Sequence, residues 1–153
     1  MDTTLLLVAA PLAGRAIGLG EVPDPVFAQS MVGPGAAVDP ERGPLITVSP
    51  IAGTLVKLKP HAFVVAGRDG RGVLVHLGID TVNLDGAGFE LLAVEGCEVE
   101  VGTPVVRWNP AEIEASGLSP ICPVIALDAP LDAVDRVAAG AIEAGRPLFH
   151  WAR

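Results

Sequence analysis

The chain has 153 residues and a formal net charge of -8 at pH 7, and half of its residues are hydrophobic. This length fits one domain with a full core, here spanning residues 1–153. The acidic balance argues against nucleic acid as a partner, because binding to a phosphate backbone needs clustered lysine and arginine. It suits a protein partner that is itself basic.

Cysteine use and the first residues bear on where the protein works. Cys97 and Cys122 lack the spacing of a metal site, and two reduced thiols in a cytoplasmic protein are the expectation. The segment TLLLVAAPLAG resembles the core of a signal peptide, but Asp2 stands where such a peptide carries positive charge. Because no apolar run reaches membrane-spanning length, we expect a cytoplasmic protein without direct membrane insertion.

Short apolar runs between turn formers predict an all-β fold. Glycine (18 residues) and proline (14 residues) interrupt the chain regularly, which predicts many short strands joined by tight turns. The echo of residues 10–14 in residues 49–53 favours an antiparallel β-sandwich with internal pseudo-symmetry. The predicted strands are Leu5–Ala9, Leu45–Val48, Gly53–Lys57, Ala62–Ala66, Val73–Leu77, Glu98–Val101, Pro104–Trp108, Val124–Leu127 and Pro147–Trp151.

One or two short helical turns complete the expected fold. Residues Pro110–Ala115 are predicted as a helix, because Asn109 can cap it and proline suits the first helical position. Leu131–Ala138 is expected to form another short helical turn or to stay irregular. All remaining segments are interpreted as turns.

Two of the three histidines, His61 and His76, lie at opposite ends of a predicted hairpin whose turn is GRDGRG. If the first four of these residues form the loop, Ala66 faces Arg71, and counting back places His61 opposite His76. Directly opposed residues share a face of the sheet, with Cβ atoms about 4.5–5.5 Å apart. A slip of one residue would put the two rings on opposite faces.

Two adjacent imidazoles are suited to phosphoryl transfer. The neutral ring nitrogen of histidine is a nucleophile near pH 7, and a second ring can donate a hydrogen bond to a phosphoryl oxygen on the first. Such transfer depends on positioning and on neutralising the charge of the oxygens. The pattern alone fits two ordinary strand histidines facing solvent about equally well.

The residues around His76 resemble a known phosphorylation site. Residues 73–82 (VLVHLGIDTV) continue into LDGAGF, and this run resembles the site region of the glucose family of enzyme IIA proteins, components of the phosphoenolpyruvate-dependent sugar phosphotransferase system. His61 precedes it at the usual separation of the second active-site histidine in that family. The resemblance covers roughly residues 5–151, with further matches at residues 11–14 (PLAG), 22–28 (VPDPVFA), 31–35 (MVGPG), 50–54 (PIAGT) and 96–102 (GCEVEVG).

The resemblance implies a single enzyme IIA domain that acts as a phosphoryl carrier with a β-sandwich fold. His76 would carry the phosphoryl group, and His61 would be its hydrogen-bonding neighbour. Such a phosphotransferase component accepts phosphate from HPr and passes it to a cysteine of a sugar-specific enzyme IIB, which supports sugar uptake. No cofactor or metal is expected. Regulation of permeases or kinases can accompany the transfer in this family.

The resemblance also implies one apolar face for both partners, although core packing is the alternative for these residues. Asp24 and Asp80 would supply carboxylates at the rim for arginine on HPr. Gly78 would let a partner backbone approach, or fix the tautomer of His76 through its carbonyl. The apolar positions of the implied face are Val26, Phe27, Met31, Val32, Leu74, Leu77 and Val82.

Four residues fall outside the family pattern or outside the site. Lys59 stands where members often have threonine, which offers a cation near the phosphate if the side chain does not simply face solvent. Asn83 stands where an acidic residue is usual, which weakens the acidic rim. His150 is interpreted as structural. Cys122 is interpreted as a buried thiol, because no basic loop surrounds it as around the phosphocysteine of enzyme IIB.

Two other functions stay open from the residues alone. A zinc peptidase on a related sandwich could use His61, His76 and Asp80 as an open metal site, although the H-x-H pair usual in such peptidases is absent. A regulatory binding module could use the same face without phosphoryl transfer. A biotinyl or lipoyl carrier is disfavoured, because no lysine lies between methionines at a hairpin tip.

Overall fold

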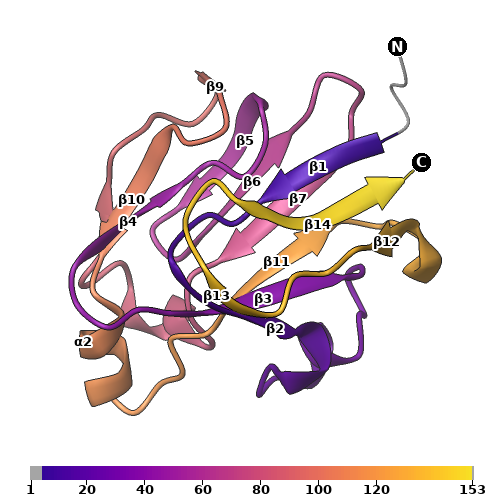
Figure 1. Ribbon diagram of the computed structural model, residues 1–153. Coiled ribbons are helices and arrows are strands. Elements are labelled where there is room, and N and C mark those ends of the chain that lie inside the picture. The colour runs from indigo at the N-terminus through magenta and orange to yellow at the C-terminus, as the bar shows by residue number, and fades with distance from the viewer. Residues whose placement is uncertain (1–4, 153) are drawn as a thin grey trace.

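The computed structural model describes residues 5–152, and antiparallel strands dominate it (Figure 1). The largest sheet has eight strands in the order β13-β2-β3-β11-β7-β6-β5-β9, and two smaller sheets have the orders β1-β14-β12 and β4-β10-β8. The strands are β1 (Leu5–Ala9), β2 (Gly14–Gly18), β3 (Gly35–Pro40), β4 (Leu45–Val48), β5 (Gly53–Lys59), β6 (Ala62–Ala66), β7 (Gly72–His76), β8 (Glu90–Leu91), β9 (Glu98–Val99), β10 (Pro104–Trp108), β11 (Cys122–Ala126), β12 (Val134–Asp135), β13 (Gly140–Ile142) and β14 (Pro147–Ala152).

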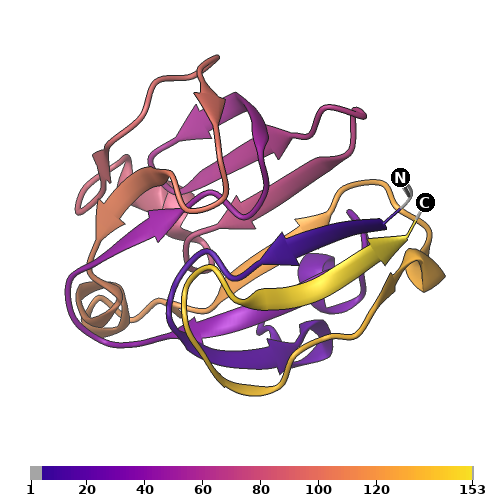
Figure 2. The same cartoon turned by 45° about the horizontal axis from the view of Figure 1, so that its top comes forward.

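The two smaller sheets pack against one face of the large sheet and enclose the main core. This core joins buried side chains of all three sheets, such as Val8 of β1, Val105 of β10 and Val75 of β7. The first and last described strands, β1 and β14, lie side by side and pair antiparallel, with Leu5 opposite Ala152 (Figure 2). The expected antiparallel β-sandwich is confirmed.

The helical segments are short and lie in the connections between strands. Asn109 caps α2 by accepting a hydrogen bond from the N–H of Ala111 at 2.9 Å, and α2 has the expected bounds. In the segment Leu131–Ala138, which was expected to be helical or irregular, Leu131–Ala133 form a 3₁₀ turn. Val134–Asp135 form strand β12 instead, so that part of the prediction is wrong. The helical elements are η1 (Leu19–Glu21), α1 (Pro25–Ala28), η2 (Thr81–Leu84), α2 (Pro110–Ala115) and η3 (Leu131–Ala133).

The interpretation of all remaining segments as turns is wrong, most clearly for β2 and β3. These strands have the sequences GRAIG and GAAVDP, which lack the clustered β-branched residues that usually signal a strand. Their glycines permit close backbone approach. A Cβ atom on Gly14 would lie 2.2 Å from the carbonyl oxygen of Asp39, and one on Gly35 would lie 2.1 Å from that of Val124. Sheet packing, not turn formation, explains both glycines.

A second apolar cluster covers the other face of the large sheet. Ile17 of β2, Ala37 of β3 and Ile125 of β11 pack there against Phe27 of α1 and Ile79, which follows β7. The N-cap of α1 is Asp24, whose Oδ1 accepts a hydrogen bond from the N–H of Val26 at 2.9 Å. This cluster therefore holds α1 beside the end of β7, where His76 lies.

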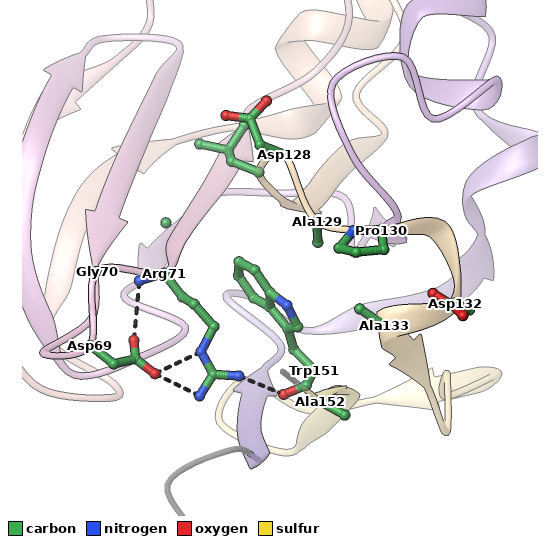
Figure 3. Close-up of a pocket in the computed structure, with 12 residues that line it drawn as sticks. Asp69, Gly70, Arg71, Asp128, Ala129, Pro130, Asp132, Ala133, Trp151 and Ala152 are labelled. Carbon is green, nitrogen blue, oxygen red and sulfur yellow. Dashed lines mark hydrogen bonds and ion pairs between the residues drawn. The ribbon is translucent and has the colours of Figure 1, made fainter.

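The turn of the β6–β7 hairpin is one residue longer than expected. The N–H of Gly67 donates to the carbonyl of Arg71 (2.8 Å), and Ala66 pairs with Gly72. Arg71 is held inside the turn because its guanidinium donates to Asp69 and to the carbonyl of Trp151 (Figure 3). The predicted pairing of Ala66 with Arg71 is therefore wrong.

Candidate functional site

His76 is the last residue of β7, a strand paired on both sides, with β6 and with β11. Its ring lies on the face of the sheet that carries the second apolar cluster. The ring centroid is 5.3 Å from that of Phe27, with an angle of 54° between the ring planes. Neighbouring strands and an aromatic contact thus hold the half-buried imidazole in place.

The carbonyl of Gly78 sets the tautomer of His76. Its oxygen lies 2.5 Å from Nδ1 of His76, and because a carbonyl only accepts hydrogen bonds, Nδ1 carries the hydrogen. Nε2 of the neutral ring therefore keeps its lone pair. Burial lowers the pKa of His76, an effect that the Gly78 carbonyl and the carboxylates of Asp24 and Asp80 oppose. The ring is thereby favoured in its neutral, nucleophilic form.

The backbone after His76 adopts an uncommon conformation that aims this carbonyl. Gly78 has φ +81°, and a Cβ atom there would lie 2.9 Å from the carbonyl oxygen of Ser119. Asp80 has φ +62° and precedes η2. The buried hydroxyl of Thr81 donates to the carbonyl of Leu77 at 2.8 Å and closes this loop. Glycine is required at position 78 by both conformation and space.

His61 lies beside His76 for a reason that the strand count missed. The β6–β7 register pairs Ala62, not His61, with His76. His61 belongs to the two-residue turn between β5 and β6, because Lys59 pairs with Ala62. Turn residues need not follow strand alternation, and the two histidine rings lie 5.3 Å apart at 70°. The expected adjacency is present, although the predicted pairing is wrong.

The environment of His61 also favours its neutral form. Burial lowers the pKa of His61 first, and the nearby His76 and Lys59 lower it further by charge repulsion. The ring of His61 can therefore present either a hydrogen-bond donor or a lone pair toward its neighbour. A negative group arriving between the rings would favour its protonation.

The apolar residues of the implied face differ in their exposure. Val26, Met31 and Val82 are 41, 67 and 54 % exposed, whereas Phe27 is almost fully buried against His76. Val32 and Leu74 are half-buried and pack on the second apolar cluster.

Leu77 does not belong to this face. It is fully buried in the main core, because its side chain alternates to the opposite side of β7 from His76.

Several residues that shape the site were not expected from the sequence. Phe27 packs in the second apolar cluster with Ile17, Leu19 and Ile125. The carbonyl of Ser119 accepts a hydrogen bond from the N–H of Ile79 at 2.9 Å. For Ile17 and Leu19, the only sequence signal was their apolar character within a segment interpreted as a turn. Ser119 contributes through its backbone, for which no side-chain pattern exists.

The other sequence-predicted residues lie elsewhere. His150 is half-buried in β14, paired with Leu7 and Asp135. Cys122 is fully buried in β11, and burial raises the pKa of its thiol to about 12. Such a thiol is unreactive at neutral pH.

One cavity of the protein lies away from the two histidines. A cavity of about 770 Å³ lies between the β6–β7 turn and β14, lined among others by Arg71 and Trp151 but by neither His61 nor His76 (Figure 3). Among residues 5–152, no group of three histidine, cysteine, aspartate or glutamate side chains is arranged to hold a metal ion. In the same part of the chain, no helix is long and apolar enough to cross a membrane.

Comparison with known proteins places this geometry in a family. The family model of the phosphoenolpyruvate-dependent sugar phosphotransferase system, EIIA 1, matches residues 6–130. The glucose-specific EIIA component of Staphylococcus aureus is 44 % identical over 122 residues, which cover 78 % of this chain and 72 % of the relative. The glucose-specific EIIA component of Oceanobacillus iheyensis is 43 % identical over 122 residues, which cover 78 % of this chain and 73 % of the relative.

A solved structure agrees with the sequence relatives. The glucose permease IIA from Mycoplasma capricolum superposes with a TM-score of 0.86 at 33 % identity, and the match covers 95 % of each chain. Family model, sequence relatives and fold therefore lead to the same conclusion: the chain belongs to the glucose-type EIIA family, the phosphotransferase components that carry a phosphoryl group on histidine during sugar uptake.

Proposed function

We propose that Nε2 of His76 is the atom that carries the phosphoryl group. The observation that carries the proposal is the hydrogen bond of Nδ1 to the Gly78 carbonyl, which leaves Nε2 with its lone pair on a ring that is only partly buried. In the transfer, a P–N bond to His76 forms while the bond between phosphorus and the donor breaks, and the donor keeps that electron pair. Positioning is the main demand of such a step.

His61 assists this transfer and does not accept the phosphoryl group from the donor. Its ring, 5.3 Å from that of His76, is close enough to donate a hydrogen bond to a phosphoryl oxygen carried by His76. Protonation of His61 would add positive charge next to the oxygens, where negative charge collects. The two histidines thus have separate roles, nucleophile and donor.

The donor is HPr, and the acceptor is a cysteine of a sugar-specific enzyme IIB. Both dock on the same face in turn, since each must reach Nε2 of His76. The exposed apolar side chains of Val26, Met31 and Val82 suit the dry centre of such an interface. Asp24 and Asp80 lie near enough to influence His76 and suit arginine on HPr. Transfer from HPr places the protein in the cytoplasm, where phosphoenolpyruvate is made.

The test is phosphorylation by enzyme I, HPr and phosphoenolpyruvate, followed by intact mass spectrometry. The wild type should gain one acid-labile phosphoryl group, and His76→Ala should gain none while keeping its circular dichroism spectrum. His150→Gln is the matched control, because it removes the histidine on β14 and should be phosphorylated as the wild type is. Stoichiometric acid-labile phosphorylation of His76→Ala would overturn the assignment.

A further inference from the structure

Lys59 and His76 occupy one row across three neighbouring strands. Lys59 of β5 pairs with Ala62 of β6, and Ala62 pairs with His76 of β7. Directly paired residues point to the same face of a sheet. With strands about 4.8 Å apart, the Cα atoms of Lys59 and His76 are separated by about 10 Å. The flexible four-carbon stem of lysine and a phosphorylated imidazole can together cover that distance.

The residue between them leaves this path open. Ala62, which pairs with both Lys59 and His76, has only a methyl group, so its own side chain does not block the lysine stem. On the next row along the same strands, Lys57 pairs with Val64, and Val64 pairs with Leu74. That row has a branched side chain in the middle and no nucleophile at its end, so the two lysines of β5 differ in what they can reach.

The charges around the histidines indicate a role for the positive charge of Lys59. Its ammonium lies near enough to His61 to act on that ring by charge repulsion, and the ring of His61 lies 5.3 Å from that of His76. No carboxylate among residues 5–152 forms an ion pair with Lys59. Asp24 and Asp80 already place negative charge near His76. A phosphoryl group would add more, and a cation is needed to balance it.

We propose that Lys59 binds a phosphoryl oxygen when His76 carries the phosphoryl group, and so stabilises the phosphorylated protein. The inference rests on the proposed role of His76. Lys59 forms no covalent bond and moves no proton in this role. Its ammonium balances the charge of the phosphoryl oxygens while the bond to His76 exists, and it releases them when the group leaves for enzyme IIB.

The decisive measurement is the equilibrium of phosphoryl exchange with HPr. Lys59→Met keeps the length of the side chain and removes its charge. It should shift the equilibrium toward phosphorylated HPr by about two- to fivefold, the range of an exposed ion pair. Lys59→Arg should restore most of the wild-type value. Lys57→Met removes a cation from the same strand and face and should leave the equilibrium unchanged. The shift should shrink at high ionic strength.

A second readout reports on the phosphoryl group directly. The pKa of the phosphoryl group, followed by ³¹P NMR, should be higher in Lys59→Met than in the wild type, because the cation favours the more negative form. His61, Asp24 and Asp80 also face this group and are unchanged in all three variants.

Two further outcomes separate the hypotheses. Equal equilibria and equal ³¹P titrations in wild type and Lys59→Met, or an equal effect of Lys57→Met, would overturn the role of Lys59. Absence of a phosphoryl group on His76 in the wild type would instead overturn the proposed function, and the role of Lys59 with it.

Discussion

The backbone N–H of Leu77 donates to the carbonyl of His61 at 2.7 Å. This bond joins the turn that carries one histidine to the end of the strand that carries the other. Leu77 is itself anchored in the main core, so the turn is tied to a rigid part of the protein. Backbone and core thus fix the two rings relative to each other before any phosphoryl group arrives.

His61→Gln should separate acceptance from donation. Glutamine keeps an N–H donor but cannot become cationic, so we expect phosphorylation of His76 by HPr to persist. Transfer onward to enzyme IIB should slow by about 10²-fold, the lower end of what loss of one such stabilising group causes. Rapid-quench measurements in both directions decide this. The double variant with Lys59→Thr is measured alongside, because Lys59 can supply part of the positive charge that glutamine lacks. Failure to accept phosphate, or donation at the wild-type rate, would contradict the assisting role.

The pH dependence of His76 should reflect its burial. Burial lowers its pKa below the ordinary value of 6.5, so at pH 6.5 a larger share of the ring is neutral than in an exposed histidine. Because only the neutral ring is a nucleophile, single-turnover acceptance of phosphate should have its midpoint below pH 6.5. ¹H–¹⁵N NMR titration of His76 checks the assignment independently of HPr. A midpoint at or above pH 6.5 would contradict it.

Phosphorylation should reverse the pH behaviour of His61. In the unphosphorylated protein, the pKa of His61 is lowered by burial and by charge repulsion from His76 and Lys59. A phosphoryl group on the adjacent ring brings negative charge, which favours the cationic form and should raise this pKa. NMR titration of His61 in phosphorylated and unphosphorylated protein measures the change. An unchanged or lower pKa after phosphorylation would show that His61 does not contact the phosphoryl group.

A charge placed on the exposed apolar face should weaken both partners. Val26→Asp is preferred to Phe27→Asp, because Phe27 is buried and an aspartate there would also unfold its surroundings. At limiting partner concentrations, Val26→Asp should slow transfer from HPr and to enzyme IIB by tenfold or more, about the loss of one central apolar contact. Ile46→Asp on β4 is the control, since Ile46 is 38 % exposed against 41 % for Val26. Equal rates in the two variants would argue against a shared docking face.

Gly78→Ala should affect both stability and transfer. Gly78 and Gly70 have similar backbone angles, φ +81° and φ +88°, but only at Gly78 would an added Cβ meet neighbouring atoms. Gly70→Ala should cost about 1 kcal/mol from backbone strain alone. Gly78→Ala should cost about 1–3 kcal/mol more from overpacking, measured by urea unfolding, and should slow phosphorylation as the carbonyl moves. Equal stabilities of the two variants would contradict the close packing at Gly78.

Sequence and structure agree best where one local signal decides the outcome. Asn109 before proline predicted α2 with the correct bounds, and β1, β4, β6 and β10 also have the expected ends. Strands β2 and β3 were not predicted, because their glycines and alanines are explained by close packing against other strands and give no local strand signal.

At the site, the types of residue around His76 predicted the function better than counting residues along the hairpin predicted the strand register. The run around His76 identified the family, but the strand register came out one residue wrong. Arg71 is drawn into the turn by Asp69 and by the carbonyl of Trp151. Trp151 is far away in the sequence, and no local pattern reveals that contact.

The pairing of β1 with β14 affects how the chain folds during its synthesis. Strands β5, β6 and β7, which together with the β5–β6 turn carry both histidines, pair with near neighbours in sequence and can associate soon after they leave the ribosome. Among the described strands, β1 is made first, yet its partner β14 is made last. Its apolar side chains therefore lack their strand partner until the other described strands have been translated, so β1 is the described strand that needs protection against aggregation for longest.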